Sequence, residues 1–428
     1  MATSPSPSLA LPQLQSVTPA TPKPSPWPIV VLAALAMVGT LPGRSQGLGL
    51  ITEPLLTELK LERVRFAEIN LWTSLAGSLF AIGFGRLFDR WGARVVALTL
   101  ALLGISVLGL SLGSGISGLL LGLWLSRGLG QSALSAGSLS LVGHVARDRP
   151  PSVMATYSIL LSVGFMVVFP VVGYLVRIVG WRVTWGGVGA SLIVLAVIAL
   201  VVLTRSRLTP VPAPDPGPSQ SSDFTLGEAL STPAFWVFGL SSSLYGLVAS
   251  GIGLFNESIL AELGFPPDLF LRSLAVTALT GLLGNFLGGW LLSRHPARTL
   301  MVPAMSLLAL GLASLPHLRS TGAVYLQAAV MGAAGGLVTV LFFSYWPRTF
   351  GNRHLGSIQG VAQFLTVVAS AAGPLVLAQI QQASGSYAFA FRFLALLTVF
   401  LGTAAWIVRT PAKPSLPAQT LSNSLAHP

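Results

Sequence analysis

Residues 85–94 read GRLFDRWGAR, a short charged turn that lies between two long apolar runs. A weaker copy of the turn, GWLLSRHPAR, follows 204 residues later at 289–298. Glycine, leucine and two arginines recur at matching places in the two copies. The stretches 47–53 and 251–257 match at the same offset. The sequence therefore predicts two repeats in the same order, which in membrane proteins are related by an axis along the membrane normal.

Composition indicates a membrane protein. Of the 428 residues, 53% are hydrophobic and 8% are charged, and the mean hydropathy is +0.77. Soluble domains average about 25% charged residues. The net charge of +12 comes from basic residues that stand singly or in pairs in short loops. They form no basic patch, so we expect a lipid bilayer as partner and no nucleic acid.

Twelve apolar runs are long enough to cross about 30 Å of hydrocarbon as helices. They are residues 27–56, 68–87, 94–113, 117–142, 154–178, 183–204, 234–260, 270–292, 299–315, 321–346, 357–381 and 388–409. This predicts an all-α polytopic protein with twelve transmembrane helices in two six-helix parallel pseudo-repeats. Because the number is even, both ends lie on one side, and the excess of Lys and Arg in the loops of that side predicts cytoplasmic termini.

The predicted organisation has five parts. They are a disordered tail (1–26), a first half (27–204), a linker with a short interfacial helix (205–233), a second half (234–409) and a second tail (410–428). The first tail lacks a basic region and a cleavage site, so helix 1 is expected to be an uncleaved span.

The turn at 85–94 resembles the loop between the second and third helices of the major facilitator superfamily. The resemblance implies that fold, transport by alternating access, and a binding site between the halves near the membrane midplane. Charge pairing around the turn is then expected to latch the halves on the cytoplasmic side; a solvated turn is the alternative. The residues of this cytoplasmic gate are Gly85, Asp89, Arg90, Gly92 and Arg94.

Two arginines fall inside predicted spans, where a charge is costly and is a functional candidate. Arg44 follows a Pro–Gly pair in helix 1, and Arg127 lies about 15 Å into helix 4 at 1.5 Å per residue. The repeat places Val248 and Met331 at the corresponding positions of the second half. Single-copy charges suit an asymmetric binding cavity. The Pro–Gly pair predicts a bend in helix 1, as in the broken helices that line transport sites.

Alternative interpretations remain open for both arginines. Arg127 resembles an arginine that many superfamily members bond to backbone carbonyls of helix 1, so a structural or gating role competes with substrate contact. Arg44 has the alternative of extending to a membrane interface.

Positive charge without a buried acid favours an anionic ligand. Neutral polar residues at similar depth are candidates to complete the site, with helix packing as the alternative for each. They are Gln46, Gln131, Thr73, Tyr245, Asn256, Thr277, Gln363 and Thr366. Glu53 and Glu257 lie near the outer ends of helices 1 and 7 and are candidates for proton coupling, against an interfacial role. No histidine lies in mid-membrane and the chain has no cysteine, so we expect no metal site, no cofactor and no enzyme.

Five stretches look like the branch of the superfamily that contains monocarboxylate and oxalate/formate carriers: 127–131, 224–236, 350–360, 373–374 and 385–387. Oxalate-type carriers place basic residues in mid-helix 8 and mid-helix 11, where this chain reads TALT (277–280) and QFLT (363–366). The departure favours a monoanion over a dianion.

The sequence thus predicts a monomeric secondary active transporter in the cell (inner) membrane that moves a small organic anion, a monocarboxylate. Efflux of hydrophobic or neutral compounds is the alternative within transport. A non-transporting receptor or scaffold is the alternative from another class.

Overall fold

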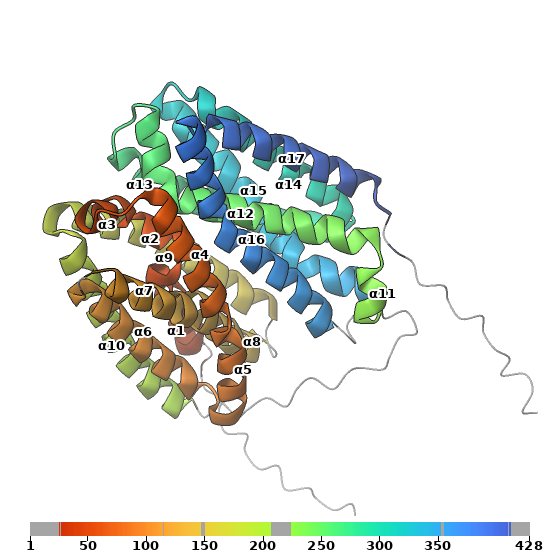
Figure 1. The fold of residues 1–428 in the computed structure, drawn as a ribbon. Coiled ribbons are helices and arrows are strands. Elements are labelled where there is room, and N and C mark those ends of the chain that lie inside the picture. Colours follow the sequence, from red (N-terminus) through yellow and green to blue (C-terminus); the bar gives the residue numbers. More distant parts are fainter. Residues whose placement is uncertain are drawn as a thin grey trace, which may run out of the picture.

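The fold was analysed in a computed structural model, which describes residues 25, 27–113, 115–146, 150–206, 224–351, 355–409 and 411. Within these ranges every regular element is a helix (Figure 1). The expected tails, most of the linker, and basic loop residues such as Arg147 and Arg149 lie outside the described residues.

The first half contains six crossings, three of which are divided into shorter helices. Its elements are α1 (Trp27–Val38), η1 (Leu41–Gly43), α2 (Ser45–Gly49), α3 (Thr52–Leu59), α4 (Arg63–Ser78), α5 (Phe80–Trp91), α6 (Arg94–Leu112), α7 (Gly115–Ser126), η2 (Arg127–Leu134), α8 (Ser135–Ala146), α9 (Pro150–Val179) and α10 (Trp181–Arg205).

The second half contains long, mostly continuous helices. They are α11 (Leu226–Leu230), α12 (Pro233–Glu262), α13 (Asp268–Leu292), α14 (Ala297–Ser314), η3 (Leu315–His317), α15 (Thr321–Phe350), α16 (Leu355–Ser384) and α17 (Ala388–Ile407). Nine helices in the described residues are each long and apolar enough to span a membrane. The divided crossings at 27–59, 63–91 and 115–146 complete the twelve that the sequence predicts.

Helix 1 is broken where Pro42 and Gly43 predict a bend. Proline lacks the amide hydrogen that an α-helix needs, and the chain passes through one 3-10 turn before Arg44 becomes extended (φ −93°, ψ 150°). The expected single span therefore consists of four short helices. In the second half, the corresponding helix α12 has only a kink at Phe255 (φ −114°, ψ 17°). The two halves thus have the same order of helices, but their first helices differ in local geometry.

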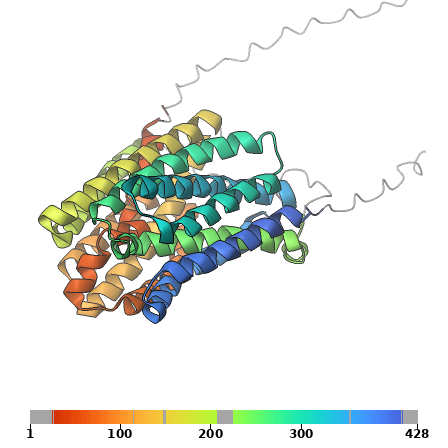
Figure 2. The same cartoon turned by 90° about the horizontal axis from the view of Figure 1, so that it is seen from above.

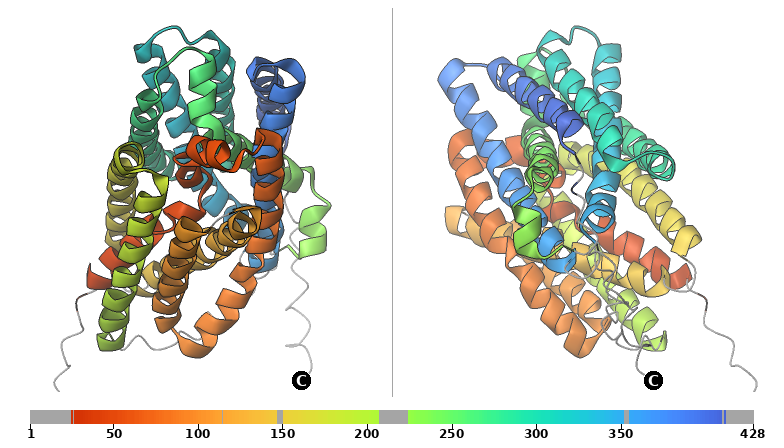
Figure 3. Two further views of the ribbon diagram at one scale, coloured as in Figure 1. Left: turned by 60° about the vertical axis from the view of Figure 1, so that its left-hand side comes forward. Right: turned by 90° about the vertical axis from the view of Figure 1, so that its right-hand side faces the viewer.

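The halves contact each other mainly through three helix pairs, which are α9 with α13, α4 with α16, and α2 with α12, and α3 also contacts α12. Figures 2 and 3 show the second half, coloured green to blue, lying alongside the first, coloured red to yellow. We call the end of the molecule that carries the α5–α6 turn the turn side, and the end that carries α3 the far side. In Figure 1, α3 and α13 lie close together on the far side, whereas α5 and α11 diverge on the turn side.

Two glycines close the far side. A Cβ atom placed on Gly49 of α2 would lie 2.2 Å from the carbonyl oxygen of Gly253 in α12. Only glycine permits such an approach of two backbones. In contrast, α5 packs within its own half, against η2, α6 and α8. This conformation is therefore closed on the far side.

Candidate functional site

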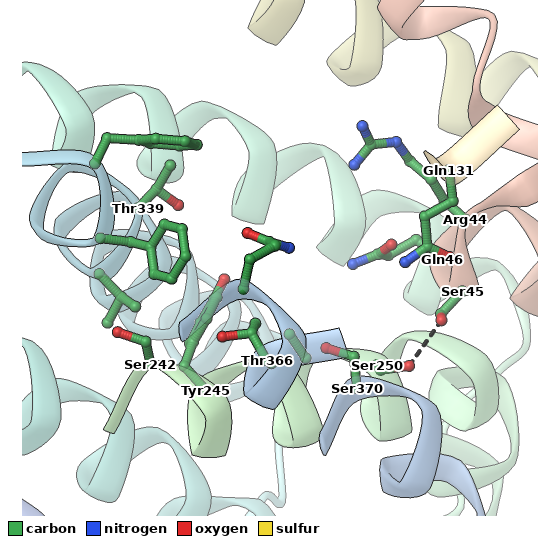
Figure 4. Close-up of a pocket in the computed structure, with 16 residues that line it drawn as sticks. Arg44, Ser45, Gln46, Gln131, Ser242, Tyr245, Ser250, Thr339, Thr366 and Ser370 are labelled. Atoms are coloured by element: carbon green, nitrogen blue, oxygen red, sulfur yellow. Dashed lines mark hydrogen bonds between the residues drawn. The ribbon is translucent and has the colours of Figure 1, made fainter. Parts of the chain in front are cut away.

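A cavity of about 320 Å³ lies between the halves (Figure 4). The first half contributes side chains from the break in helix 1 and from η2, and the second half contributes faces of α12, α15 and α16. The lining residues are Arg44, Ser45, Gln46, Gln131, Ser242, Tyr245, Gly246, Ala249, Ser250, Val338, Thr339, Phe342, Phe343, Gln363, Thr366 and Ser370.

Arg44 provides the one charge in this lining. Its Nε donates to Thr40 Oγ1 at 2.6 Å, and its Nη2 lies 3.0 Å from Met37 Sδ and 3.4 Å from Ser135 Oγ. The guanidinium also lies 5.3 Å from the ring centroid of Phe165. No acid bonds it in the described part of the chain. The neighbours hold the guanidinium in place, and its Nη1 is left for a ligand.

Arg127 lies behind the break and does not line the cavity. Its Nη1 donates to the carbonyl oxygen of Gly43 at 2.9 Å and to Gln131 Oε1 at 2.8 Å. Both Nη atoms lie 3.3 Å from Ser45 Oγ, and Nη2 donates to Asn70 Oδ1. Arg127 therefore satisfies a carbonyl that the break frees, and this geometry matches the structural alternative that the sequence left open.

The same bonds orient the first-half lining. Because the oxygen of Gln131 accepts from Arg127, its amide hydrogens are left to donate to a ligand. Ser45 also lies 2.8 Å from Ser250 Oγ of α12, across the boundary between the halves. This hydroxyl pair forms the far-side end of the cavity.

Five of the predicted neutral residues meet in the cavity: Gln46, Gln131, Tyr245, Gln363 and Thr366. Their presence on one surface reflects helical spacing. The lining positions of α16 are 363, 366 and 370, which repeat at intervals of three and four residues.

Three other candidates do not line this cavity. Thr73 donates its hydroxyl to the carbonyl of Ile69, and Thr277 donates to the carbonyl of Ser273. Asn256 Nδ2 lies 3.5 Å from Ser273 Oγ. Asn256 thus bonds across two helices, as does Thr277, whose hydroxyl also lies 3.2 Å from the carbonyl oxygen of Ala328, whereas Thr73 bonds only to the backbone of its own helix.

The sequence analysis missed the small and aromatic parts of the lining. Ser242, Ala249 and Ser250 share one face of α12 with Tyr245, and Phe342 and Phe343 come from α15. The spacing of the α12 residues contained the signal, because positions 242, 245, 246, 249 and 250 fall on one helical stripe.

The gate residues lie at the turn side. Gly92 ends α5 with φ +66°, a conformation that favours glycine. Arg90 and Arg94 are exposed. The surroundings of Gly85 and the side chain of Asp89 are not among the described parts of the chain, so the latch stays a prediction.

Glu53 and Glu257 lie at the far side. Glu53 accepts two hydrogen bonds from Arg63 Nη2, at 2.9 and 3.0 Å. Glu257 is half-buried, and its charged neighbours are Glu53 and Arg177. Glu53 and Arg63 also line a second cavity, of about 410 Å³, between α3, α4 and α16. Within the described ranges, no cluster of three metal-ligating side chains occurs.

The sequence profile described as the Major Facilitator Superfamily matches residues 32–374. The chain belongs to the major facilitator superfamily. It is therefore a multi-pass membrane transporter and not an enzyme, with a small-molecule substrate. A search of curated proteins finds no match.

Solved superfamily transporters share its fold. A bacterial homologue of the human lysosomal transporter Spinster, inward-facing and unoccupied, is 16% identical with a TM-score of 0.64, covering 90% of this chain and 96% of its own. The same homologue in its occupied form has a TM-score of 0.61. A mutant of the nucleoside transporter NupG is 15% identical with a TM-score of 0.69, covering 89% of this chain and 98% of its own.

Proposed function

We propose that this superfamily member is a secondary active transporter for a small organic anion, a monocarboxylate. The observation that carries the proposal is Arg44, a cation in the cavity between the halves that no described acid neutralises. A cation facing a cavity at low dielectric is favourable for a carboxylate that accepts hydrogen bonds from it. The amide of Gln131 and the hydroxyl pair of Ser45 and Ser250 supply further donors beside it.

The proposed mechanism is alternating access. The anion enters from one side, and the halves rock about the cavity so that the far-side glycine contact separates as the turn side closes. We infer that the turn side is cytoplasmic, that the cell (inner) membrane holds the protein, and that it acts as a monomer. Asp89, Arg90 and Arg94 then latch the cytoplasmic side when it closes.

Efflux of a hydrophobic or neutral compound is the second candidate, and the rings of Phe342 and Phe343 in the lining favour it. That function gives Arg44 no role. A receptor or scaffold needs neither a cavity between the halves nor a gate. The nucleoside and lysosomal functions in the titles of the similar structures belong to those proteins, and at 15–16% identity they do not choose the substrate here.

Thermal unfolding of the purified protein tests the proposal. We expect small carboxylates to raise the melting temperature of the native protein but not of Arg44→Gln, with phosphates and neutral compounds as comparison ligands. Arg65→Gln is the matched control, because Arg65 is exposed and pairs with Glu68 at the surface. Stabilisation by neutral compounds alone, unchanged in Arg44→Gln, would refute the anion site and favour efflux.

A further inference from the structure

The cavity is polarised along its length. At the far-side end, Ser250 of α12 bonds to Ser45 beside Arg44. Towards the turn side, Phe238 of α12 stacks on Tyr345 of α15 with ring centroids 3.7 Å apart. The two helices run in opposite directions, so Phe342 lies near the level of Ser242. From Ser242 to Ser250 the distance along α12 is about 12 Å.

The Arg44 end offers the one positive charge of the lining, with polar side chains beside it. Gln46, Gln131, Ser45 and Ser250 are the lining residues of this end. The single guanidinium can hold one carboxylate, to which its free Nη1 donates a charge-assisted hydrogen bond. A second carboxylate placed elsewhere in the lining would be desolvated without a counter-charge, which is costly. The cavity therefore selects for one negative charge at one end.

The opposite end carries two aromatic rings, with the hydroxyls of Ser242 and Thr339 at the same end (Figure 4). The rings of Phe342 and Phe343 meet edge to face with centroids 5.4 Å apart, and both line the cavity beside Val338. Phe343 keeps 52% of its surface exposed, although it belongs to this lining. An aromatic or compact apolar group that covers these rings gains both buried area and ring contacts.

We propose that the ligand is an amphipathic monoanion, with its carboxylate at Arg44 and an aromatic ring at Phe342 and Phe343, joined by a short apolar chain. The inference rests on the proposed function and names the substrate class of the same site. A volume of about 320 Å³ is near the lower end of ligand pockets, about 300–1,000 Å³. The ligand is therefore one ring with a short chain, and not a lipid or a polycyclic compound.

A homologous ligand series tests this class. Benzoate, phenylacetate, 3-phenylpropionate, 4-phenylbutyrate and 5-phenylvalerate place the ring progressively further from the carboxylate. We expect the dissociation constant to fall about fourfold for each added methylene until the ring reaches Phe343, and to rise beyond that length. Acetate and propionate, which lack the ring, are expected to bind more weakly than the phenylalkanoate with the lowest dissociation constant. Binding is read from thermal stabilisation and from competition with uptake into proteoliposomes.

Two substitutions connect the series to the aromatic end. In Phe343→Leu we expect about a two- to tenfold loss of affinity for the optimum phenylalkanoate, with acetate binding unchanged. Phe364→Leu is the matched control, because Phe364 is exposed and does not line the cavity. An unchanged melting temperature of the ligand-free variants shows that both are folded.

The outcomes separate this inference from the proposed function. Equal or tighter binding of acetate than of every phenylalkanoate, still abolished by Arg44→Gln, would overturn the amphipathic class and leave the anion site standing. Equal binding of 4-phenylbutan-1-ol and 4-phenylbutyrate, with Arg44→Gln unaffected, would overturn the anion site itself. An affinity loss in Phe364→Leu as large as in Phe343→Leu would remove the assignment of the aromatic end.

Discussion

One methyl group added at the far-side glycine contact is expected to shift the balance between the two conformations of the transporter. In Gly49→Ala the new Cβ would lie 2.2 Å from the carbonyl oxygen of Gly253, a backbone atom that cannot rotate away. The two halves then have to move apart at the far side. We expect Gly49→Ala to favour the conformation that is open on the far side.

The magnitude follows from the kind of clash. Forcing an extra methyl group into a packed interior costs about 1–3 kcal/mol, which is about a 5- to 160-fold change in the ratio of the two conformations. Gly253→Ala is expected to have a much smaller effect. Its Cβ would meet the side chain of Gln46 at 3.1 Å, and that side chain can move.

The assay is a distance measurement between two spin labels. The chain has no cysteine, so Thr57→Cys in α3 and Gln382→Cys in α16 introduce the only thiols. Both positions are exposed and line the second cavity on the far side, between the halves. We expect the label distance to lengthen in Gly49→Ala and to stay nearly unchanged in Gly253→Ala.

Gly187→Ala is the control, because a Cβ on Gly187 of α10 meets nothing within 4 Å. A distance distribution in Gly49→Ala that equals those of the parent and of Gly187→Ala would refute the reasoning. It would show that the glycine contact does not hold the far side closed.

Three further predictions follow from other contacts. Arg127→Met removes the interhelical hydrogen bonds to Gly43, Ser45 and Asn70. At about 0.6 kcal/mol for each such bond in a membrane, we expect about 2 kcal/mol of destabilisation in a reversible unfolding assay, with no recovery in Arg127→Lys, which lacks the fork. Hydrogen bonds, chiefly from Arg182, hold the pKa of the Glu58 carboxylate below its usual value. The folding stability that this carboxylate contributes is therefore present above about pH 4.3 and is lost as the pH falls through the lowered pKa. The melting temperature of Glu58→Gln should thus lie about 1–2 °C below the parent at pH 7 and meet it in strong acid; a gap that persists there contradicts the pairing. If Glu257 couples protons, Glu257→Gln abolishes the dependence of uptake on a pH gradient, and an unchanged dependence excludes it.

The number of crossings was predictable because a membrane leaves the backbone little choice. Every buried amide and carbonyl needs an internal partner, so apolar runs of sufficient length become helices. The break in helix 1 was also predictable, from Pro42 and Gly43. The breaks at Leu79 and in η2 were not, because no proline marks them. A Cβ on Gly77 would lie 2.9 Å from the amide nitrogen of Gly128, so tertiary packing between helices 2 and 4 accompanies both irregularities.

The sequence predicts how deep the candidate residues lie in the membrane, but only partly which way their side chains face. Sequence position along a span gives depth at 1.5 Å per residue, but each residue also turns the side chain by about 100°. Arg44 and Tyr245 face the cavity, whereas Thr73 and Thr277 lie at comparable depth and bond to helix backbones. Which face meets the cavity depends on how the halves pack, and that arrangement is not encoded in any single span.

The π-helical segment η2 has a consequence for insertions and deletions in this protein. Its wider turn contains one residue more than an α-helical turn, so deleting one residue from 128–134 allows a regular α-helix in which α8 keeps nearly its present orientation relative to α7. The hydroxyl of Ser138, which donates to the carbonyl of Ala33 at 2.7 Å and lies 2.9 Å from the hydroxyl of Tyr157, then keeps both partners. A one-residue deletion in the regular helix outside η2 would instead rotate the residues that follow by about 100°, so η2 is where a relative can lack one residue of helix 4 and still present the same surface to helices 1 and 5.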